Sequence, residues 1–168
     1  MKKDVNPVSE LSASGIYVLM LFASKEVTLT IGKLGKQRFP RGYYTYTGSA
    51  LGKGATSLKH RIVRHLRKEK RKFWHIDYLL ADENVSVEAV IAAETNKKKM
   101  ECNLNSHIKG IEGAEVPVNG FGASDCRKKN CVSHLLYFPD IQNADWLVQK
   151  LVGHLQSVSG ILSVYVVH

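Results

Sequence analysis

The sequence lacks the features of a secreted or membrane-spanning protein. None of its apolar runs approaches the ~20 residues that a helix needs to cross a bilayer. The amino terminus soon becomes polar, and the apolar stretch from Ile16 to Ala23 begins too late for a signal peptide. The cysteines, Cys102, Cys126 and Cys131, are odd in number, which does not suggest a secreted disulfide framework. We therefore expect a cytoplasmic protein in a reducing compartment, with no membrane partner.

Acidic residues are also scarce. The chain has 15 Asp and Glu against 24 Lys and Arg, which gives a formal net charge of +9. A basic surface binds polyanions well because it releases counterions from their phosphates, so this balance favours nucleic acid as a partner. A generally basic globular protein would have the same composition, and the motifs must decide. With 168 residues, 44% of them hydrophobic, the chain is long enough for one domain with its own core.

The pattern of apolar residues predicts the α/β (α+β) class, with a small, mixed and largely antiparallel sheet flanked by helices. The expected strands cover residues 15–22, 27–31, 42–48, 85–93 and 161–167. The expected helices begin near residue 58 and at residues 97 and 145, and a short element covers 74–80. The first three strands have short connections, so we expect them to be neighbours in one antiparallel sheet. We divide the chain into a polar arm (1–14), a main domain (15–138) and a terminal helix and strand packed on that domain (139–168).

A strongly basic helix is expected after the glycine-rich link that follows the third strand. Leu58, Ile62 and Leu66 recur every four residues and predict its buried face, and Thr56 or Ser57 could cap it. A run of charge is usually a solvated face, but charge of one sign costs self-repulsion that phosphates would relieve. The residues that we expect to contact nucleic acid are Lys59, Arg64, Arg67, Lys68 and Arg71.

Two tripeptides and the segments that follow them resemble the GIY-YIG nuclease superfamily. Gly15-Ile16-Tyr17 lies on the first expected strand, and Tyr46-Thr47-Gly48 ends the third. A glycine link and a helix with Arg61 come next, as in that superfamily. Further on, Glu101-Cys102-Asn103-Leu104 opens a helix and resembles the segment whose glutamate binds the metal in a repair nuclease of the superfamily. The order of the motifs and the types of element all agree with this resemblance.

Four longer segments resemble one subfamily of uncharacterised GIY-YIG domains, which are found alone or fused to endonuclease III-type glycosylases. These segments are residues 43–50, 74–79, 120–126 and 131–135. The resemblance runs from about Gly15 to Phe138 and implies a functional link to a DNA repair glycosylase. Two features depart from it: nearly thirty residues separate the tripeptides, which predicts an inserted strand or hairpin, and only Asn119 matches the late asparagine of the family, by order alone.

The resemblance implies a metal-dependent endonuclease that hydrolyses phosphodiester bonds in DNA, with RNA as the alternative substrate. Glu101 would hold Mg²⁺ (or Mn²⁺), a hard ion that prefers oxygen ligands. Arg61 would stabilise charge on the phosphate, and His65, on the same side of the helix, would move a proton or bind phosphate. Tyr17 or Tyr46 would act as general base or position the water, although a phenol with its ordinary pKa needs nearby positive charge for that. These five residues are the predicted catalytic set.

Plainer interpretations stand beside each of these roles. Glu101 could be a surface glutamate, His65 an exposed histidine on a basic helix, and the two tyrosines could simply pack in the sheet. The whole chain could then be a nucleic-acid-binding module of the same fold without catalysis. A third possibility is an adaptor for a repair glycosylase, whose binding would persist at high salt.

A zinc site is a separate alternative for the cysteines. Cys126, Cys131 and His134 offer three ligands, with Cys102 or His107 as a fourth. Structural zinc sites usually show tighter paired spacing, so the sequence favours ordinary thiols over a metal.

Overall fold

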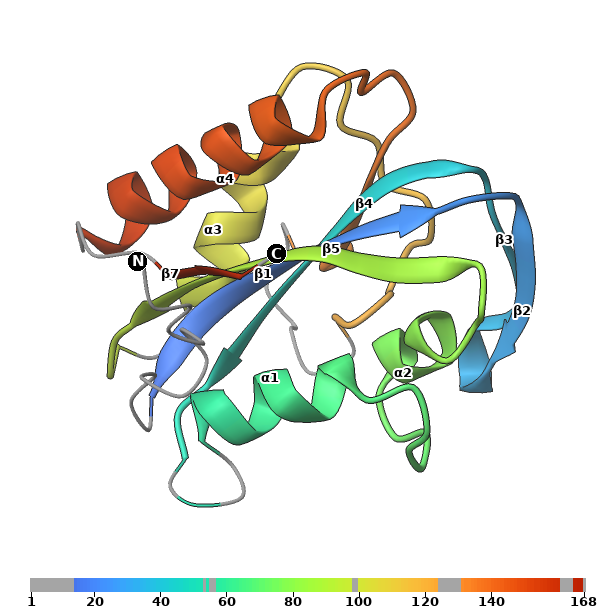
Figure 1. Cartoon of the computed structure of the whole chain (residues 1–168), viewed down its shortest axis with the longest axis horizontal. Helices are drawn as coiled ribbons and strands as arrows, with labels where there is room; N and C mark the ends of the chain where they lie inside the picture. The colour runs from blue at the N-terminus through green and yellow to red at the C-terminus, as the bar shows by residue number, and fades with distance from the viewer. Residues whose placement is uncertain are drawn as a thin grey trace, which may run out of the picture.

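The structure of the chain, a computed structural model, describes residues 14–52, 54, 57–97, 100–123, 131–160 and 165–167. Its centre is a five-stranded sheet of order β6-β4-β1-β5-β7, in which every neighbouring pair is antiparallel (Figure 1). The strands are β1 (Gly15–Ala23), β4 (Gly42–Ala50), β5 (Val85–Glu94), β6 (Leu135–Phe138) and β7 (Tyr165–Val167). The helices are α1 (Leu58–Leu66), α2 (His75–Leu80), α3 (Met100–Lys109) and α4 (Ala144–Ser159). The predicted class, a largely antiparallel sheet flanked by helices, is confirmed.

The central strand β1 is buried on both faces, as its unbroken apolar sequence predicts. Tyr17 and Leu19 belong to the core under α1 and α2, whereas Ile16 and Val18 belong to the core under α3 and α4 (Figure 1). Because successive side chains of a strand point to opposite faces, one strand supplies both layers. The helix pairs therefore lie on opposite sides of the sheet, and a site that joins them must lie at an edge.

The segment between β1 and β4 forms a separate hairpin. β2 (Val27–Ile31) pairs with β3 (Gly35–Phe39) across the 3-10 turn η2 (Gly32–Leu34). The strand expected at 27–31 is confirmed, but its expected place beside the first strand is wrong, because β1 pairs with β4 and β5 instead. Polar residues alternate along β2 and β3, so each can bury only one face, whereas a central strand is covered on both. This hairpin is the insertion expected between the two tripeptides.

Helix α1 is shorter than its run of charge suggested and buries a different residue at its end. Ser57 caps it by accepting a hydrogen bond from the backbone N–H of His60, at 3.3 Å. Leu66, predicted to be buried, is 43% exposed, whereas His65 is only 3% exposed. The reason is the helical period: at 3.6 residues per turn, Leu66 is rotated about 80° from Leu58, but His65 only about 20°. The helix ends at Leu66, so the later cations lie in a loop.

The other expected elements agree with the structure within a few residues, whereas strand β6 was not expected from the sequence. The helix expected from residue 97 is α3 and begins at Met100, and the helix expected from residue 145 is α4, which packs with α3 on the same face of the sheet. The last strand is described at residues 165–167, whereas residues 161–164 and most of the expected arm, residues 1–13, lie outside the described residues. In the described part of the chain, no helix combines the length and the apolar character that crossing a membrane requires.

Candidate active site

A pocket of about 180 Å³ opens beside the second half of β4, beyond Tyr46, where β6 no longer pairs with that strand. Its lining residues are Tyr17, Tyr46, Gly48, Ser49, Arg61, His65, Trp74, Glu101, Gly122 and His134. All five residues of the predicted catalytic set are among them. They come from β1, β4, α1 and α3, so four separate elements meet at this edge of the sheet.

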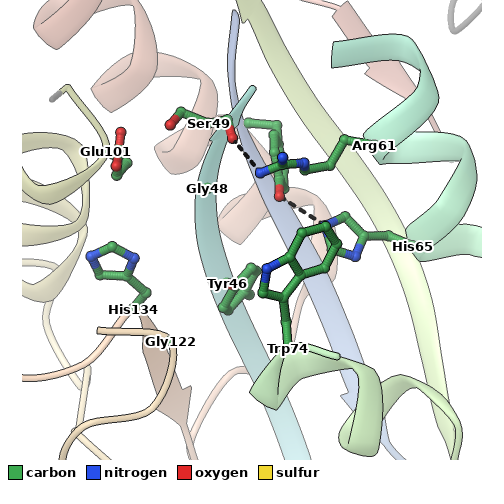
Figure 2. A pocket seen from close by; sticks show the side chains of 10 residues that line it. Tyr46, Gly48, Ser49, Arg61, His65, Trp74, Glu101, Gly122 and His134 are labelled. Atoms are coloured by element: carbon green, nitrogen blue, oxygen red, sulfur yellow. Dashed lines mark hydrogen bonds between the residues drawn. The ribbon is translucent and has the colours of Figure 1, made fainter. Parts of the chain in front are cut away.

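Glu101 supplies the only carboxylate among the described residues that line the pocket. It lies in the first turn of α3, and Figure 2 shows it with His134 on the side of the pocket away from Arg61. The oxygen Oε2 of Glu101 is buried and accepts no hydrogen bond from the residues that the structure describes. An unsatisfied buried oxygen is costly, and a bound cation is one way to satisfy it. This donor set fits a hard ion such as Mg²⁺, which takes one or two carboxylates and keeps several waters.

Arg61 lies opposite the carboxylate and is held in place by two contacts. Its Nη1 donates a hydrogen bond to the backbone oxygen of Ser49, at 2.9 Å. Its guanidinium carbon is 4.7 Å from the centre of the Trp74 ring, a cation–π distance. The planar guanidinium carries five N–H donors, so a group fixed in this way can still pair with two oxygens of a phosphate.

A buried hydrogen bond joins Tyr17 to His65 across the floor of the pocket. The phenol oxygen of Tyr17 is 2.8 Å from Nε2 of His65. Burial, with a smaller contribution from the charge of Lys70, lowers the pKa of His65 to about 3. Burial, together with the neighbouring Tyr46, raises the pKa of Tyr17 well above its ordinary value, while Arg61 acts in the opposite direction. Both partners are therefore neutral near pH 7.

Tyr46 is held in place by ring packing, whereas Tyr17 is held by a hydrogen bond. Its ring meets His65 and Phe121 edge-on, with centroids 6.2 Å and 6.3 Å apart. Burial raises the pKa of Tyr46 to about 12, although the charge of Arg61 lowers it. A neutral, packed phenol can orient a ligand or a water, but it cannot serve as a base without further positive charge nearby.

Glycine at position 48 is required by the phenol beside it. A Cβ atom on Gly48 would overlap the Tyr17 hydroxyl oxygen and lie 2.6 Å from the adjoining ring carbon. Gly122 is similar on the other side: its φ is +67°, and a Cβ there would lie 2.8 Å from the ring of Tyr46. The third residue of Tyr46-Thr47-Gly48 is therefore glycine for a local physical reason: the backbone at this position passes close to the groups that line the pocket.

Among the pocket residues, Trp74 and Gly122 had no role in the sequence-based hypothesis. Trp74 precedes α2, and its ring lies 4.7 Å from Arg61 and 4.3 Å from Arg64. Gly122 is held by a hydrogen bond from its backbone N–H to Nδ1 of His75, at 2.9 Å. The sequence showed only an aromatic segment before α2 and a glycine-rich segment later. The spacing of residues in these segments does not reveal which elements meet in the fold. Asn119 is exposed and is not among the lining residues in the described part of the chain.

The residues predicted to contact nucleic acid divide into two groups. Lys59, Arg67 and Arg71 are exposed. Arg64 is directed inward, because its two terminal nitrogens donate to the carboxylate of the fully buried Asp77, at 2.7 Å and 2.8 Å. Both side chains of that ion pair are therefore committed to the fold.

Lys68 also has hydrogen-bond partners within the chain. Its Nζ donates to the backbone oxygens of Leu80 and Asp82, at 3.1 Å and 3.0 Å. Its charge ties the loop after α1 to the end of α2 and the following turn. The exposed cations Lys59, Arg67 and Arg71 are thus better placed for a phosphate backbone than Arg64 and Lys68, and this narrows the predicted set.

Comparison with known proteins adds one match. The family model described as "Domain of unknown function DUF123" matches residues 16–157. The matched range runs from β1 to α4 and includes every residue that lines the pocket. No curated protein and no solved structure matches the chain.

Proposed function

The chain belongs to the DUF123 family, whose description assigns no activity, and we propose that it is a metal-dependent endonuclease of GIY-YIG type that hydrolyses phosphodiester bonds in DNA. One observation carries the proposal: a carboxylate, a guanidinium and a hydrogen-bonded phenol line one small pocket, although they come from three separate elements. Phosphodiester hydrolysis requires a positioned water, a stabiliser of the charge on the phosphoryl oxygens and help for the departing 3′ oxygen, and these three groups can supply them. The absence of a long apolar run supports a cytoplasmic site of action.

Glu101 is the residue that would hold the metal. Glu101 lines the pocket, and its buried oxygen Oε2 accepts no hydrogen bond from the described residues, so a bound cation would satisfy it. When bound there, Mg²⁺ or Mn²⁺ would withdraw charge from a phosphoryl oxygen and assist departure of the 3′ oxygen.

Arg61 is the residue that would bind the scissile phosphate from the opposite side. Its contacts with Ser49 and Trp74 fix the guanidinium before a substrate arrives. Charge that develops on the phosphoryl oxygens is stabilised most by donors that need not reorganise. Trp74 therefore contributes by holding Arg61 rather than by contacting the reacting atoms.

Tyr17 and His65 would position the attacking water. Because Tyr17 is neutral near pH 7, its hydroxyl is suited to orient a water rather than to remove its proton. Neutral His65 has one acceptor nitrogen; with Nε2 as that acceptor, the Tyr17 hydroxyl donates to it and directs its lone pairs toward the pocket. Arg61 and a bound cation would both lower the pKa of Tyr17, which is the condition for it to act as general base.

The loop that follows α1 would grip the nucleic acid. It carries the exposed cations Arg67 and Arg71, and Phe73 at its end is 77% exposed. An exposed aromatic ring beside cations is typical of proteins that stack on a base while they bind the backbone. Trp74, next to Phe73, lines the pocket, so a strand bound to this loop would lie near the proposed metal.

Cleavage of DNA tests the proposal directly. Supercoiled plasmid and branched DNA are incubated with Mg²⁺ or Mn²⁺ and the wild-type chain, Glu101→Gln, Arg61→Ala or the control Glu83→Gln, which changes an exposed glutamate outside the pocket. We expect nicking by the wild type and the control, and a loss of roughly 100-fold or more in the two pocket variants. Salt-sensitive binding without cleavage on any substrate would support the alternative, a binding module without catalysis. Equal cleavage by all four proteins would place the activity elsewhere.

A further inference from the structure

Two sulfur atoms and one imidazole nitrogen lie close together next to the start of α3, which carries the carboxylate of Glu101. Sγ of Cys131 lies 2.9 Å from Nε2 of His134 and 3.1 Å from Sγ of Cys102. Sγ of Cys102 lies 3.5 Å from the same nitrogen of His134. His134 is buried, and both cysteines are partly buried. All three ligand atoms therefore surround one point in the interior.

We propose that Cys102, Cys131 and His134 bind a zinc ion in the reduced chain. Thiolate and imidazole are the ligands that zinc prefers, and Zn–S and Zn–N distances of about 2.3 Å and 2.0 Å place tetrahedral ligand atoms roughly 3.5–3.8 Å apart. The three observed separations, 2.9, 3.1 and 3.5 Å, reach that geometry with shifts below about 1 Å. This site is chemically distinct from the carboxylate oxygen of Glu101, which favours a hard cation.

The proposed zinc site differs from the one that the sequence suggested as an alternative. Of the two fourth ligands considered there, Cys102 meets the pair Cys131 and His134. His107 is exposed and lies near His154 instead, with ring centroids 6.4 Å apart. Cys126 lies outside the described residues, and the proposal rests on the other three side chains.

Oxidation is the competing fate of these sulfurs. Cys102 is disulfide-bonded in this structure, and a sulfur in a disulfide cannot bind zinc as a thiolate. The two states are mutually exclusive, so the proposal applies to the reduced chain. The buried imidazole of His134 distinguishes the zinc-bound state from the disulfide, because His134 completes a metal site but has no part in a disulfide.

A zinc ion at this point would position Glu101. Cys102 is the next residue in the first turn of α3, whereas Cys131 and His134 precede β6. One turn further along α3, Nδ2 of Asn105 donates to the backbone oxygen of Ser133 at 2.6 Å, so a second contact already joins the same two segments. Zinc would fix the start of α3 and hence the direction of the carboxylate. This positioning role rests on the proposed function, whereas zinc binding itself does not.

Metal content tests the site independently of cleavage. The full chain is purified under reducing conditions as wild type, Cys131→Ser, His134→Asn and Glu101→Gln, and zinc is measured by mass spectrometry. We expect about one zinc per chain in the wild type and in Glu101→Gln, and at least about tenfold less in the two ligand variants. The control Glu101→Gln separates the two proposals, since it should lose cleavage and keep zinc.

Cobalt substitution covers the case in which a ligand variant fails to fold. Apo wild type, prepared with a chelator, is titrated with Co²⁺, and a thiolate-to-cobalt charge-transfer band is expected. Reduced wild type without zinc and without this band would overturn the proposal, as would equal zinc in the wild type and the ligand variants. For positioning, zinc removal should raise the Mg²⁺ concentration that gives half-maximal cleavage, and an unchanged value would exclude that role.

Discussion

At the scale of single residues, the pair Tyr17 and His65 shows how burial controls chemistry. Both groups titrate in water, but inside the pocket each is held in its neutral form, because burial disfavours the charged form of either. The Tyr17 hydroxyl and His65 Nε2 satisfy each other at 2.8 Å. Because His65 is buried in its neutral form, it makes the free energy of unfolding depend on pH, and it is also the hydrogen-bond partner of the Tyr17 phenol.

The sign of that dependence follows from the pKa of His65. In the folded chain the pKa of His65 is about 3, below the ordinary value of 6.5, so at intermediate pH the unfolded chain binds a proton that the folded chain does not. The contribution to stability is therefore complete above about pH 6.5 and is lost as the pH falls toward about 3. We expect the free energy of unfolding of the wild type, minus that of His65→Gln, to fall by roughly 1 kcal/mol per pH unit between about pH 6 and pH 4.

Urea unfolding at several pH values measures this difference. His60→Gln is the matched control, since His60 lies on the exposed side of the same helix. A difference between wild type and His65→Gln that stays constant over the acidic range would show that His65 is not buried as a neutral group. Glutamine retains a donor and an acceptor near Tyr17, so the comparison isolates the titration.

At the scale of elements, the corner between α1 and α2 organises one side of the pocket. Asp77 is fully buried and accepts hydrogen bonds from Arg64 and from the backbone N–H groups of Phe73 and Trp74. Arg64 in turn stacks on Trp74, which also lies against Arg61. One buried carboxylate therefore fixes the loop, the tryptophan and, through it, the arginine of the proposed site.

Replacing Asp77 by asparagine should weaken both the fold and the site. The substitution removes the charge that compensates a partly buried guanidinium, and we expect a loss of about 3 kcal/mol in the free energy of unfolding. We also expect slower cleavage, because asparagine offers one acceptor oxygen in place of two, so the hydrogen bonds from Arg64 and from the backbone N–H of Trp74 cannot all be kept. Urea unfolding and plasmid nicking measure the two effects, with the exposed Asp140→Asn as control. A stability within about 0.5 kcal/mol of the wild type would contradict the structural role of the ion pair.

At the scale of the whole molecule, the net charge of +9 should govern binding. If exposed cations contact phosphates, the logarithm of the DNA affinity falls linearly with the logarithm of the salt concentration, with a slope of about −0.9 for each phosphate contacted. We expect this dependence in fluorescence anisotropy titrations with labelled DNA. Arg71→Ala should reduce the steepness by about 1. Affinity that is independent of salt would favour the adaptor alternative over nucleic-acid binding.

Much of the architecture could be predicted because its cause is local. The apolar run of β1 predicts a strand buried on both faces, and the repeat in α1 predicts a helix with Leu58 and Ile62 inside. The resemblance placed Glu101 and Arg61 on separate helices, and both line the pocket. The hairpin of β2 and β3 was harder, because alternation predicts a half-buried strand but does not identify its partner.

The sequence by itself determined the types of element, the basic character and the residue types available for chemistry, since these depend on composition and on periods of a few residues. Only the tertiary structure decided which of those residues meet. Arg64 reaches Asp77 across 13 positions, and Cys102 reaches His134 across 32. Contacts of that range follow from how helices pack on a sheet, and no local period records them. For this reason Arg64 and Lys68, two of the residues expected to contact nucleic acid, also have partners within the chain. The zinc alternative, which the sequence did not favour, became the proposal for Cys102, Cys131 and His134.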